Sequence, residues 1–199
     1  MAVNTWQGDD GSSPTDWGTA ANWSGGIPDA TDDIIIPDCS LIGNCILDGD
    51  TTINSLELKE NSNFSMNNHD LTVDGENGSG RAIDVGGSGA TFVGGTGTLI
   101  FTLGSGATNL TGISHLAAST ELRNLQFNGA ATFTMGGAMT VNGNLTITAG
   151  TLSTSGDNNY ALTVTGGIKN TGTLTANAST IIITGEFEGF ALNQMGTFN

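Results

Sequence analysis

Carboxylates gather in three short loops near the beginning of the chain. They are Asp9 and Asp10 in Gly8-Asp9-Asp10-Gly11, Asp32 and Asp33 at the end of Asp29 to Asp33, and Asp48 and Asp50 in Asp48-Gly49-Asp50. Calcium prefers several oxygen ligands close together, so each loop could contribute to a calcium site. No loop matches the EF-hand or the glycine-rich calcium repeat, and solvated loops without an ion account for the same residues. The sequence contains no motif for another cofactor.

Cleavage of a polysaccharide is the second chemistry that acidic residues could perform. Glycoside hydrolysis needs two or three carboxylates on one face, and elimination from a uronate needs a base beside a cation. The carboxylates expected in strands are Glu57, Asp84, Glu121 and Glu186, and the four cations are Lys59, Arg81, Arg123 and Lys169. In the register of the internal repeat described below, these carboxylates form no cluster and the cations are scattered. We therefore expect no catalytic residue and no enzymatic activity.

The histidines and cysteines offer little further chemistry. His69 precedes Asp70 in a turn, but no serine or cysteine is placed to complete a catalytic triad, and His115 lies in a stretch of Thr and Ser. Cys39 and Cys45 lie close together in a turn-rich segment, so they form either a small disulfide loop or two buried thiols. Two cysteines without a nearby histidine do not make a zinc site.

An internal repeat predicts the element that carries these residues. The stretch 53–75 resembles the stretch 122–143. Ile53, Leu56, Leu58, Phe64 and Met66 correspond to Leu122, Leu125, Phe127, Phe133 and Met135 at a constant offset of 69 in the numbering. The repeating unit is about 23 residues long, a third of this offset, and a fixed period of this size is typical of a solenoid. The coils of a solenoid bury their apolar faces against one another.

Short alternating segments predict strands rather than helices. Leu71-Thr-Val73, Ile83-Asp-Val85 and Leu145-Thr-Ile147 each place two apolar residues on one face, and Gly, Asn, Asp and Ser separate such segments. Landmarks of the form Gly-Thr-apolar recur at 97, 150, 172 and 196. Coils are therefore expected to begin near residues 53, 76, 99, 122, 143, 166 and 185. We predict an all-β, single-stranded β-solenoid, a right-handed parallel β-helix of about seven coils over residues 46–199, with an incomplete last coil at Gly196.

The segment 1–45 differs from the rest and is expected to be an irregular N-terminal cap. It contains all three tryptophans, Trp6, Trp17 and Trp23, and all three prolines. The open end of a solenoid exposes strand edges and core, and large aromatic side chains can cover both. An aromatic patch that binds a glycan is the alternative interpretation of the same tryptophans.

Composition and charge exclude several partners. The chain has 199 residues with 19 acidic and 4 basic side chains, a formal net charge of −15. Nucleic acid and anionic membranes are poor partners for such a chain, because a phosphate backbone needs clustered Lys and Arg. No apolar run is long enough for a transmembrane helix, so no membrane insertion is expected. The first residues, Met1-Ala2-Val3-Asn4, do not form a signal peptide.

Three stretches of the N-terminal segment carry a resemblance to known proteins. Trp6-Gln-Gly, the stretch Trp17 to Pro28 with its Asn22-Trp23-Ser-Gly-Gly, and Asp32 to Ile36 resemble the opening of large bacterial surface β-helix adhesins. They also resemble the N-termini of phage virion proteins with repetitive β-rich bodies. GNLTITAGTL, ALTVTGGI and NTGTLTANASTIIITG, over 143–152, 161–168 and 170–185, are similar to the body coils of both groups.

The resemblance implies a structural or adhesive protein in a virion or extracellular setting. Its partners would be other virion or surface-structure proteins, a cell-surface glycan or receptor, and two further copies in a homotrimer. Because no signal peptide is expected, we favour a phage component, such as a fibre, an appendage or a capsid or tail decoration. A fragment of a secreted bacterial adhesin is the alternative, and a polysaccharide-degrading β-helix enzyme is the third hypothesis.

Overall fold

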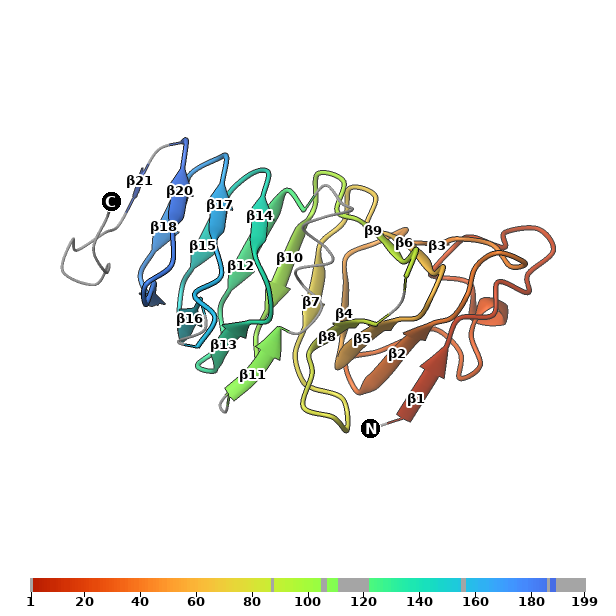
Figure 1. Cartoon of the computed structure of the whole chain (residues 1–199). Helices are drawn as coiled ribbons and strands as arrows, with labels where there is room; N and C mark the ends of the chain where they lie inside the picture. The colour runs from red at the N-terminus through yellow and green to blue at the C-terminus, as the bar shows by residue number, and fades with distance from the viewer. Residues whose placement is uncertain are drawn as a thin grey trace.

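Short parallel strands stack coil upon coil from one end of the molecule to the other (Figure 1). The computed structural model describes residues 2–86, 88–104, 107–110, 122–154, 157–185 and 187–188. In these residues the pairings between strands are all parallel, and the helical structure is one short 3₁₀ turn at Ala20–Asn22. The chain is thus an all-β solenoid of about six turns with roughly 23 residues per coil.

One face of the solenoid is a continuous sheet of seven strands. We call it the third face, because along the chain its strands follow those of the first and second faces described below. Its strands are β4 (Thr51–Ile53), β7 (Leu71–Val73), β10 (Thr98–Phe101), β12 (Asn124–Phe127), β15 (Leu145–Ile147), β18 (Ile168–Asn170) and β21 (Phe187–Glu188). Its register shows that coil length varies. Leu71 pairs with Leu99, and Ile168 pairs with Phe187, so the coil between the first two residues is much longer than the coil between the second two.

The other two faces of the solenoid, the first and the second, each consist of two shorter sheets. The first face consists of β1 (Ala2–Thr5), β2 (Asp32–Ile36), β5 (Ser55–Leu58) and β8 (Ile83–Val85), and then of β11 (Ala107–Leu110), β13 (Thr132–Met135), β16 (Thr151–Ser153) and β19 (Thr173–Thr175). The second face consists of β3 (Cys45–Ile46), β6 (Asn63–Ser65) and β9 (Thr91–Val93), and then of β14 (Met139–Val141), β17 (Leu162–Val164) and β20 (Ile181–Ile183).

Alternation along each strand separates core from surface. In β12, Leu125 and Phe127 are buried while Asn124 and Gln126 are partly exposed. Because side chains alternate with a period of two, each strand sends its apolar residues inward against those of the neighbouring coils. The result is one core that extends from Trp6 to Leu174. No helix in the described part of the chain is both long and apolar enough to cross a membrane.

The internal repeat correctly predicts the solenoid but assigns residues to the wrong faces. The offset of 69 equates Leu56 of β5, on the first face, with Leu125 of β12, on the third. The structural partners of Leu125 are Leu99 and Leu145. Strands on each of the three faces, such as β5, β7 and β14, contain an apolar–polar–apolar run, so a comparison of sequences can slip by one face.

The predicted coil starts are accurate where coils have ordinary lengths. Apart from the start at 76, each predicted position lies close to the first residue of a third-face strand. The predicted start at 76 falls beyond the end of β7, which begins at Leu71, because the coil from Thr51 to Leu71 is shorter than the period of roughly 23 residues. The incomplete coil expected at Gly196 lies outside the described residues.

The N-terminal segment is more regular than predicted. Strands β1 and β2 lie within residues 1–45, and β2 pairs with both β1 and β5. The ladder therefore begins at Ala2 rather than near residue 46. The sequence conceals β1 because its buried, inward residue is Asn4 rather than an apolar side chain, so the period-two signal is missing.

Candidate functional site

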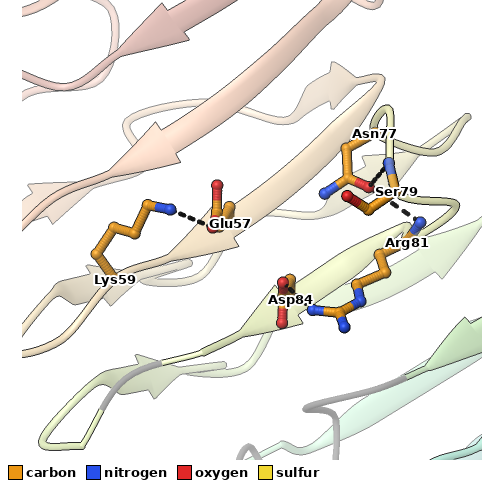
Figure 2. A network of polar contacts seen from close by, with 6 residues as sticks. All are labelled: Glu57, Lys59, Asn77, Ser79, Arg81 and Asp84. Atoms are coloured by element: carbon orange, nitrogen blue, oxygen red, sulfur yellow. Dashed lines mark hydrogen bonds and ion pairs between the residues drawn. The ribbon is translucent and has the colours of Figure 1, made fainter.

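Two carboxylates lie side by side on the outer surface of the first face. Glu57 of β5 and Asp84 of β8 are direct partners in the parallel register (Figure 2). Neighbouring strands of a sheet are about 4.8 Å apart. The expectation that the strand carboxylates form no cluster is therefore wrong for this pair. A fixed period does not align the two, because the loop before β8 lengthens this coil beyond the usual length of roughly 23 residues.

Each of these carboxylates is bound by a cation of its own chain. Lys59 donates to Glu57 and Arg81 donates to Asp84. The side chain of Asp84 is 12% exposed and that of Glu57 is 25% exposed, whereas the two cations are more open to solvent. Half of the four basic residues of the chain are used here to neutralise two neighbouring acids.

A tight turn places Arg81 for this role. Oδ1 of Asn77 accepts hydrogen bonds from the backbone N–H groups of Ser79 and Arg81 at 3.0 and 3.1 Å (Figure 2). The backbone N–H of Asn77 donates in return to the carbonyl of Arg81 at 2.9 Å. An asparagine that closes a turn in this way fixes the following residues locally. The loop thus holds the guanidinium beside Asp84.

In the acidic loops proposed for calcium, carboxylate oxygens accept hydrogen bonds from other groups of the chain. Oδ2 of Asp10 accepts from Ser12 and Ser13, and Oδ1 of Asp33 accepts from Asn54 and Ser55 at 2.6 Å each. These contacts tie turns and neighbouring coils together.

Of the remaining candidate carboxylates near the N-terminus, two accept hydrogen bonds from backbone N–H groups and one is exposed. Oδ2 of Asp32 accepts from the N–H of Asp29, Oδ2 of Asp48 accepts from the N–H of Gly18, and Asp9 is exposed. Among the described residues, no three His, Cys, Asp or Glu side chains gather as a metal site would require.

A column of Asp and Asn residues runs along the corner that precedes the third face. Oδ1 of Asp50 accepts from the backbone N–H of Asp70 at 2.9 Å, and Oδ1 of Asp70 accepts from that of Thr98 at 2.7 Å. Further along the stack, the same contact recurs with asparagine. We call these four residues, Asp50, Asp70, Asn124 and Asn144, the Asx column.

Two exposed aspartates near the N-terminus have lowered pKa values. The hydroxyl and then the backbone N–H of Thr31 donate to Asp29 and lower its pKa, and Ser40 acts in the same way on Asp38. Hydrogen bonds to a carboxylate stabilise its charged form, which is the physical cause of the direction. Both residues close turns and do not converge on a ligand.

The two cysteines are free, buried thiols. Of the two interpretations left open by the sequence, the structure therefore contains the thiols. Burial raises the pKa of Cys45 well above its ordinary value, with smaller contributions from Cys39 and Asp48, and burial also raises the pKa of Cys39. Such thiols are poor nucleophiles, because the thiolate is the reactive form.

The histidines do not extend the site. Nδ1 of His69 lies 3.6 Å from Oδ1 of Asp50, an ion pair when the imidazole is protonated. His115, Glu121 and Glu186 lie outside the described residues. The partner of His69 is thus a residue of the Asx column rather than a nucleophile.

The three tryptophans are buried at the N-terminal end of the core. Trp6, Trp17 and Trp23 are 1–3% exposed, and the ring of Trp23 meets the other two edge to face at centroid distances of 5.0 and 4.6 Å. Trp17 continues this contact to Phe64 of β6. A sugar stacks on an open aromatic face, and these faces are covered.

The segment that contains Trp23 also covers the edge of β1. The N–H of Ser24 donates to the carbonyl of Thr5, and Oγ of Ser24 accepts from the N–H of Thr5. Asn4, buried to 1% exposure, accepts from the N–H of Gly25 and donates to the carbonyl of Gly26, both at 2.9 Å. An unpaired strand edge invites association with other strands, so this contact protects the first coil.

A separate hollow lies where the second face turns into the third. Its volume is about 410 Å³, and it is lined by Asn144, Leu145, Thr146, Gly166, Gly167, Ile168, Lys169 and Gly185. The strands beside it are β15 and β18, in the C-terminal half of the stack (Figure 1). The sequence shows Lys169 as one of four cations but gives no indication of a depression beside it.

Comparison with known proteins gives no relative from which a function could be transferred. No family model, no curated protein and no solved structure matches the chain.

Proposed function

We propose that this chain is a non-enzymatic structural and adhesive β-helical protein, and specifically a component of a phage particle such as a fibre, an appendage or a decoration of capsid or tail. A β-solenoid fits a structural or adhesive role, because it is a rigid body with repetitive outer faces. The observation that carries the proposal is the order of polar side chains on those faces.

Hydroxyl groups form two straight rows on the first face. One row consists of Thr132, Thr151 and Thr173, and the parallel row consists of Thr134, Ser153 and Thr175. All six are partly exposed, and successive members belong to paired strands. The threonines are stiff at χ1, so the rows present fixed hydroxyl and methyl groups at the strand spacing. Such a surface suits docking or attachment better than it suits catalysis.

The two neighbouring strand carboxylates support a non-enzymatic role. A glycosidase needs one carboxyl that gives a proton to the leaving group and another that attacks or activates water. Glu57 and Asp84 are instead each bound by a cation of the chain, Lys59 and Arg81. Each ion pair lies within a single coil and neutralises its carboxylate there, and we assign both pairs to stability.

The virion assignment rests on the resemblance of the tryptophan-containing segment to phage virion proteins and on the acidic, strongly charged N-terminal half. By this proposal the chain works in a virion or extracellular setting, docks on other structural proteins, and forms a homotrimer. Neither nucleic acid nor a membrane is a partner, in keeping with the net charge of −15.

Immunogold labelling tests this proposal most directly. An antibody against the full chain would be applied to particles purified from a lysate of the source culture and to the cells of that culture. Labelled particles support the virion assignment, and labelled cell envelopes support the secreted adhesin instead. If neither is labelled although the chain is expressed, the structural and adhesive proposal is wrong.

Light scattering on the purified chain tests the oligomer separately. A mass of three times 20.2 kDa supports the homotrimer, and a mass of 20.2 kDa contradicts it.

A further inference from the structure

The two hydroxyl rows of the first face form a grid that repeats in two directions. Along each row, successive side chains belong to paired strands, so they recur at the strand spacing of about 4.8 Å. Across the rows, two residues of one strand stand two positions apart, as Thr132 and Thr134 do, which separates them by about 6.6 Å at the usual rise per residue. The first face therefore presents hydroxyl and methyl groups at two fixed spacings.

Buried side chains hold this grid in place. Between the two rows, Phe133, Leu152 and Leu174 point into the core, and each is 0% exposed. They are register partners of one another in β13, β16 and β19, so the backbone of all three strands is anchored from within. Threonine is stiff at χ1, so the groups on the outside keep the spacing of the backbone.

The hydroxyls of the grid are available to a ligand. In the part of the chain that the structure describes, the hydroxyl groups of its five threonines make no hydrogen bond. The sixth hydroxyl, that of Ser153, accepts from Nδ2 of Asn177 at 3.3 Å and keeps its own hydrogen to donate. A hydroxyl both donates and accepts, as a water molecule does.

No charged side chain belongs to the grid. Residues 122–185 contain three charged side chains, Arg123, Asp157 and Lys169. Arg123 and Lys169 lie beside β12 and in β18 on the third face, and Asp157 lies between β16 and β17. The N-terminal half of the first face differs, because Glu57 and Asp84 occupy its strands. A charged group orders water around itself, so the uncharged half is the one that can meet a regular lattice of water.

We propose that the hydroxyl grid of β13, β16 and β19 binds ice. The two spacings of the grid are close to the repeat distances of oxygen atoms on a prism face of ice, so its hydroxyls can take the places of lattice waters. Water beside an apolar group loses orientational freedom, so the methyl groups between the hydroxyls favour an ordered layer. This activity goes beyond the proposed structural and adhesive function and does not depend on the virion assignment.

A soluble sugar is a poorer match for this surface. Small-ligand sites are concave, and none of the six residues of the grid lines the hollow beside β15 and β18. The tryptophans that could stack on a sugar ring are buried at the other end of the stack. The periodic feature of the grid is its spacing, and a crystal of water is a ligand that is recognised by spacing.

Partition into slowly growing ice tests the proposal. A solution of the full chain and lysozyme, which serves as a protein that does not bind ice, would be frozen gradually onto a cold probe. We expect the ice to be enriched in the chain relative to lysozyme, and we expect the chain to slow the recrystallisation of ice grains held just below the melting point. Exclusion of the chain from ice to the same extent as lysozyme would overturn the proposal.

Two threonine-to-lysine substitutions in one coil identify the face. Thr151→Lys places a strongly hydrated charge at the centre of the grid, and the enrichment in ice should be lost. Thr163→Lys is the matched control, because Thr163 is also partly exposed and lies in β17, the middle strand of the second face. It should keep the enrichment of the parent chain.

Circular dichroism would establish that both lysine variants are folded before the comparison. If Thr151→Lys does not fold, Thr173→Lys in β19 replaces it, at the end of the same row. Equal loss of enrichment in the grid variant and the Thr163→Lys control, or full enrichment in both, would overturn the assignment of ice binding to this face.

Discussion

Oδ1 of Asp70 accepts a hydrogen bond from the backbone N–H of Thr98 at 2.7 Å. The two residues occupy the same corner of successive coils. The contact holds the longest coil of the third face in register with its neighbour, where a loop of extra residues could otherwise let it slip. A backbone N–H at a corner has no ladder partner of its own, so the carboxylate supplies one.

Asp70→Ala should therefore lower the free energy of unfolding by about 1–3 kcal/mol, the cost of leaving a partly buried N–H unsatisfied. The measurement is urea-induced unfolding followed by circular dichroism. Asp9→Ala removes the same charge from an exposed carboxylate and should change stability by no more than about 0.5 kcal/mol. Equal effects of the two substitutions would mean that net charge, not the Asx column, controls stability.

Gly95 should tolerate no side chain. Its φ is +57°, and a Cβ there would lie 1.4 Å from the carbonyl oxygen of Asn67. Both strain and overlap act on the same residue, so we expect Gly95→Ala to destabilise the fold by about 3 kcal/mol or more, or to prevent folding.

Gly78→Ala serves as the control for this substitution, since no atom lies within 4 Å of the added Cβ and its φ is not positive. It should leave the midpoint of thermal unfolding unchanged or raise it slightly by restricting the unfolded chain. A large loss with Gly78→Ala would point to a general sensitivity of glycines rather than to close coil stacking.

Alkaline pH should destabilise the fold through Cys45. Burial raises the pKa of this thiol above the ordinary value of 9.0, so the folded state keeps the proton that the unfolded state releases. The contribution of the thiol to stability is complete below the unfolded pKa and is lost as pH rises toward the folded pKa. In this range the free energy of unfolding falls by at most about 1.4 kcal/mol per pH unit because of this thiol.

The comparison of Cys45→Ala with the parent chain isolates this effect. The substitution leaves a cavity, and the cost of that cavity does not depend on pH. The stability of the Cys45→Ala protein should therefore fall less steeply than that of the parent chain between about pH 8.5 and 10.5. Parallel curves for the two proteins would show that Cys45 does not control the alkaline transition.

Acidic pH should act through the turn carboxylates. Hydrogen bonds from Thr31 lower the pKa of Asp29, so the contribution of this group is present above the unfolded pKa and is lost as pH falls through the folded pKa. Thr31→Val should raise the pKa of Asp29 toward its ordinary value, as carbon-detected NMR titration would show. The pKa of Asp38, which depends on Ser40 first, should not change.

The sequence predicts the solenoid well because the signal is repeated in every coil. Pairs of apolar residues two positions apart in one strand, such as Leu71 and Val73, appear many times, and glycines mark the corners. The same redundancy explains the error of one face, because similar apolar–polar–apolar runs occur on all three faces. The length of an individual coil is invisible to periodicity, and so the neighbours Glu57 and Asp84 could not be recognised from a fixed period.

The candidate sites were less predictable, because they depend on the backbone rather than on residue type. The Asx column is visible only when coils of unequal length are aligned, as Asp50 with Asp70 and Asp70 with Thr98. The hollow beside β15 and β18 is lined by Gly166, Gly167 and Gly185, whose spacing resembles that of ordinary turns. The period-two pattern does not reveal β1, because its inward residue, Asn4, is polar.

Asn4 should prove essential to the N-terminal end of the stack. Its side chain bonds both the N–H of Gly25 and the carbonyl of Gly26, and these contacts hold the covering segment on the edge of β1. Asn4→Ala leaves both backbone groups without a partner, so we expect a loss of about 2–4 kcal/mol in the free energy of unfolding, from two groups at about 1–3 kcal/mol each with partial rescue by water. The released edge should also promote self-association, visible as concentration-dependent mass in sedimentation velocity.

Val3→Ala, at a 60% exposed position of the same strand, is the control and should change neither stability nor mass. If the Asn4→Ala protein behaved like the Val3→Ala protein, the edge would be protected by other means.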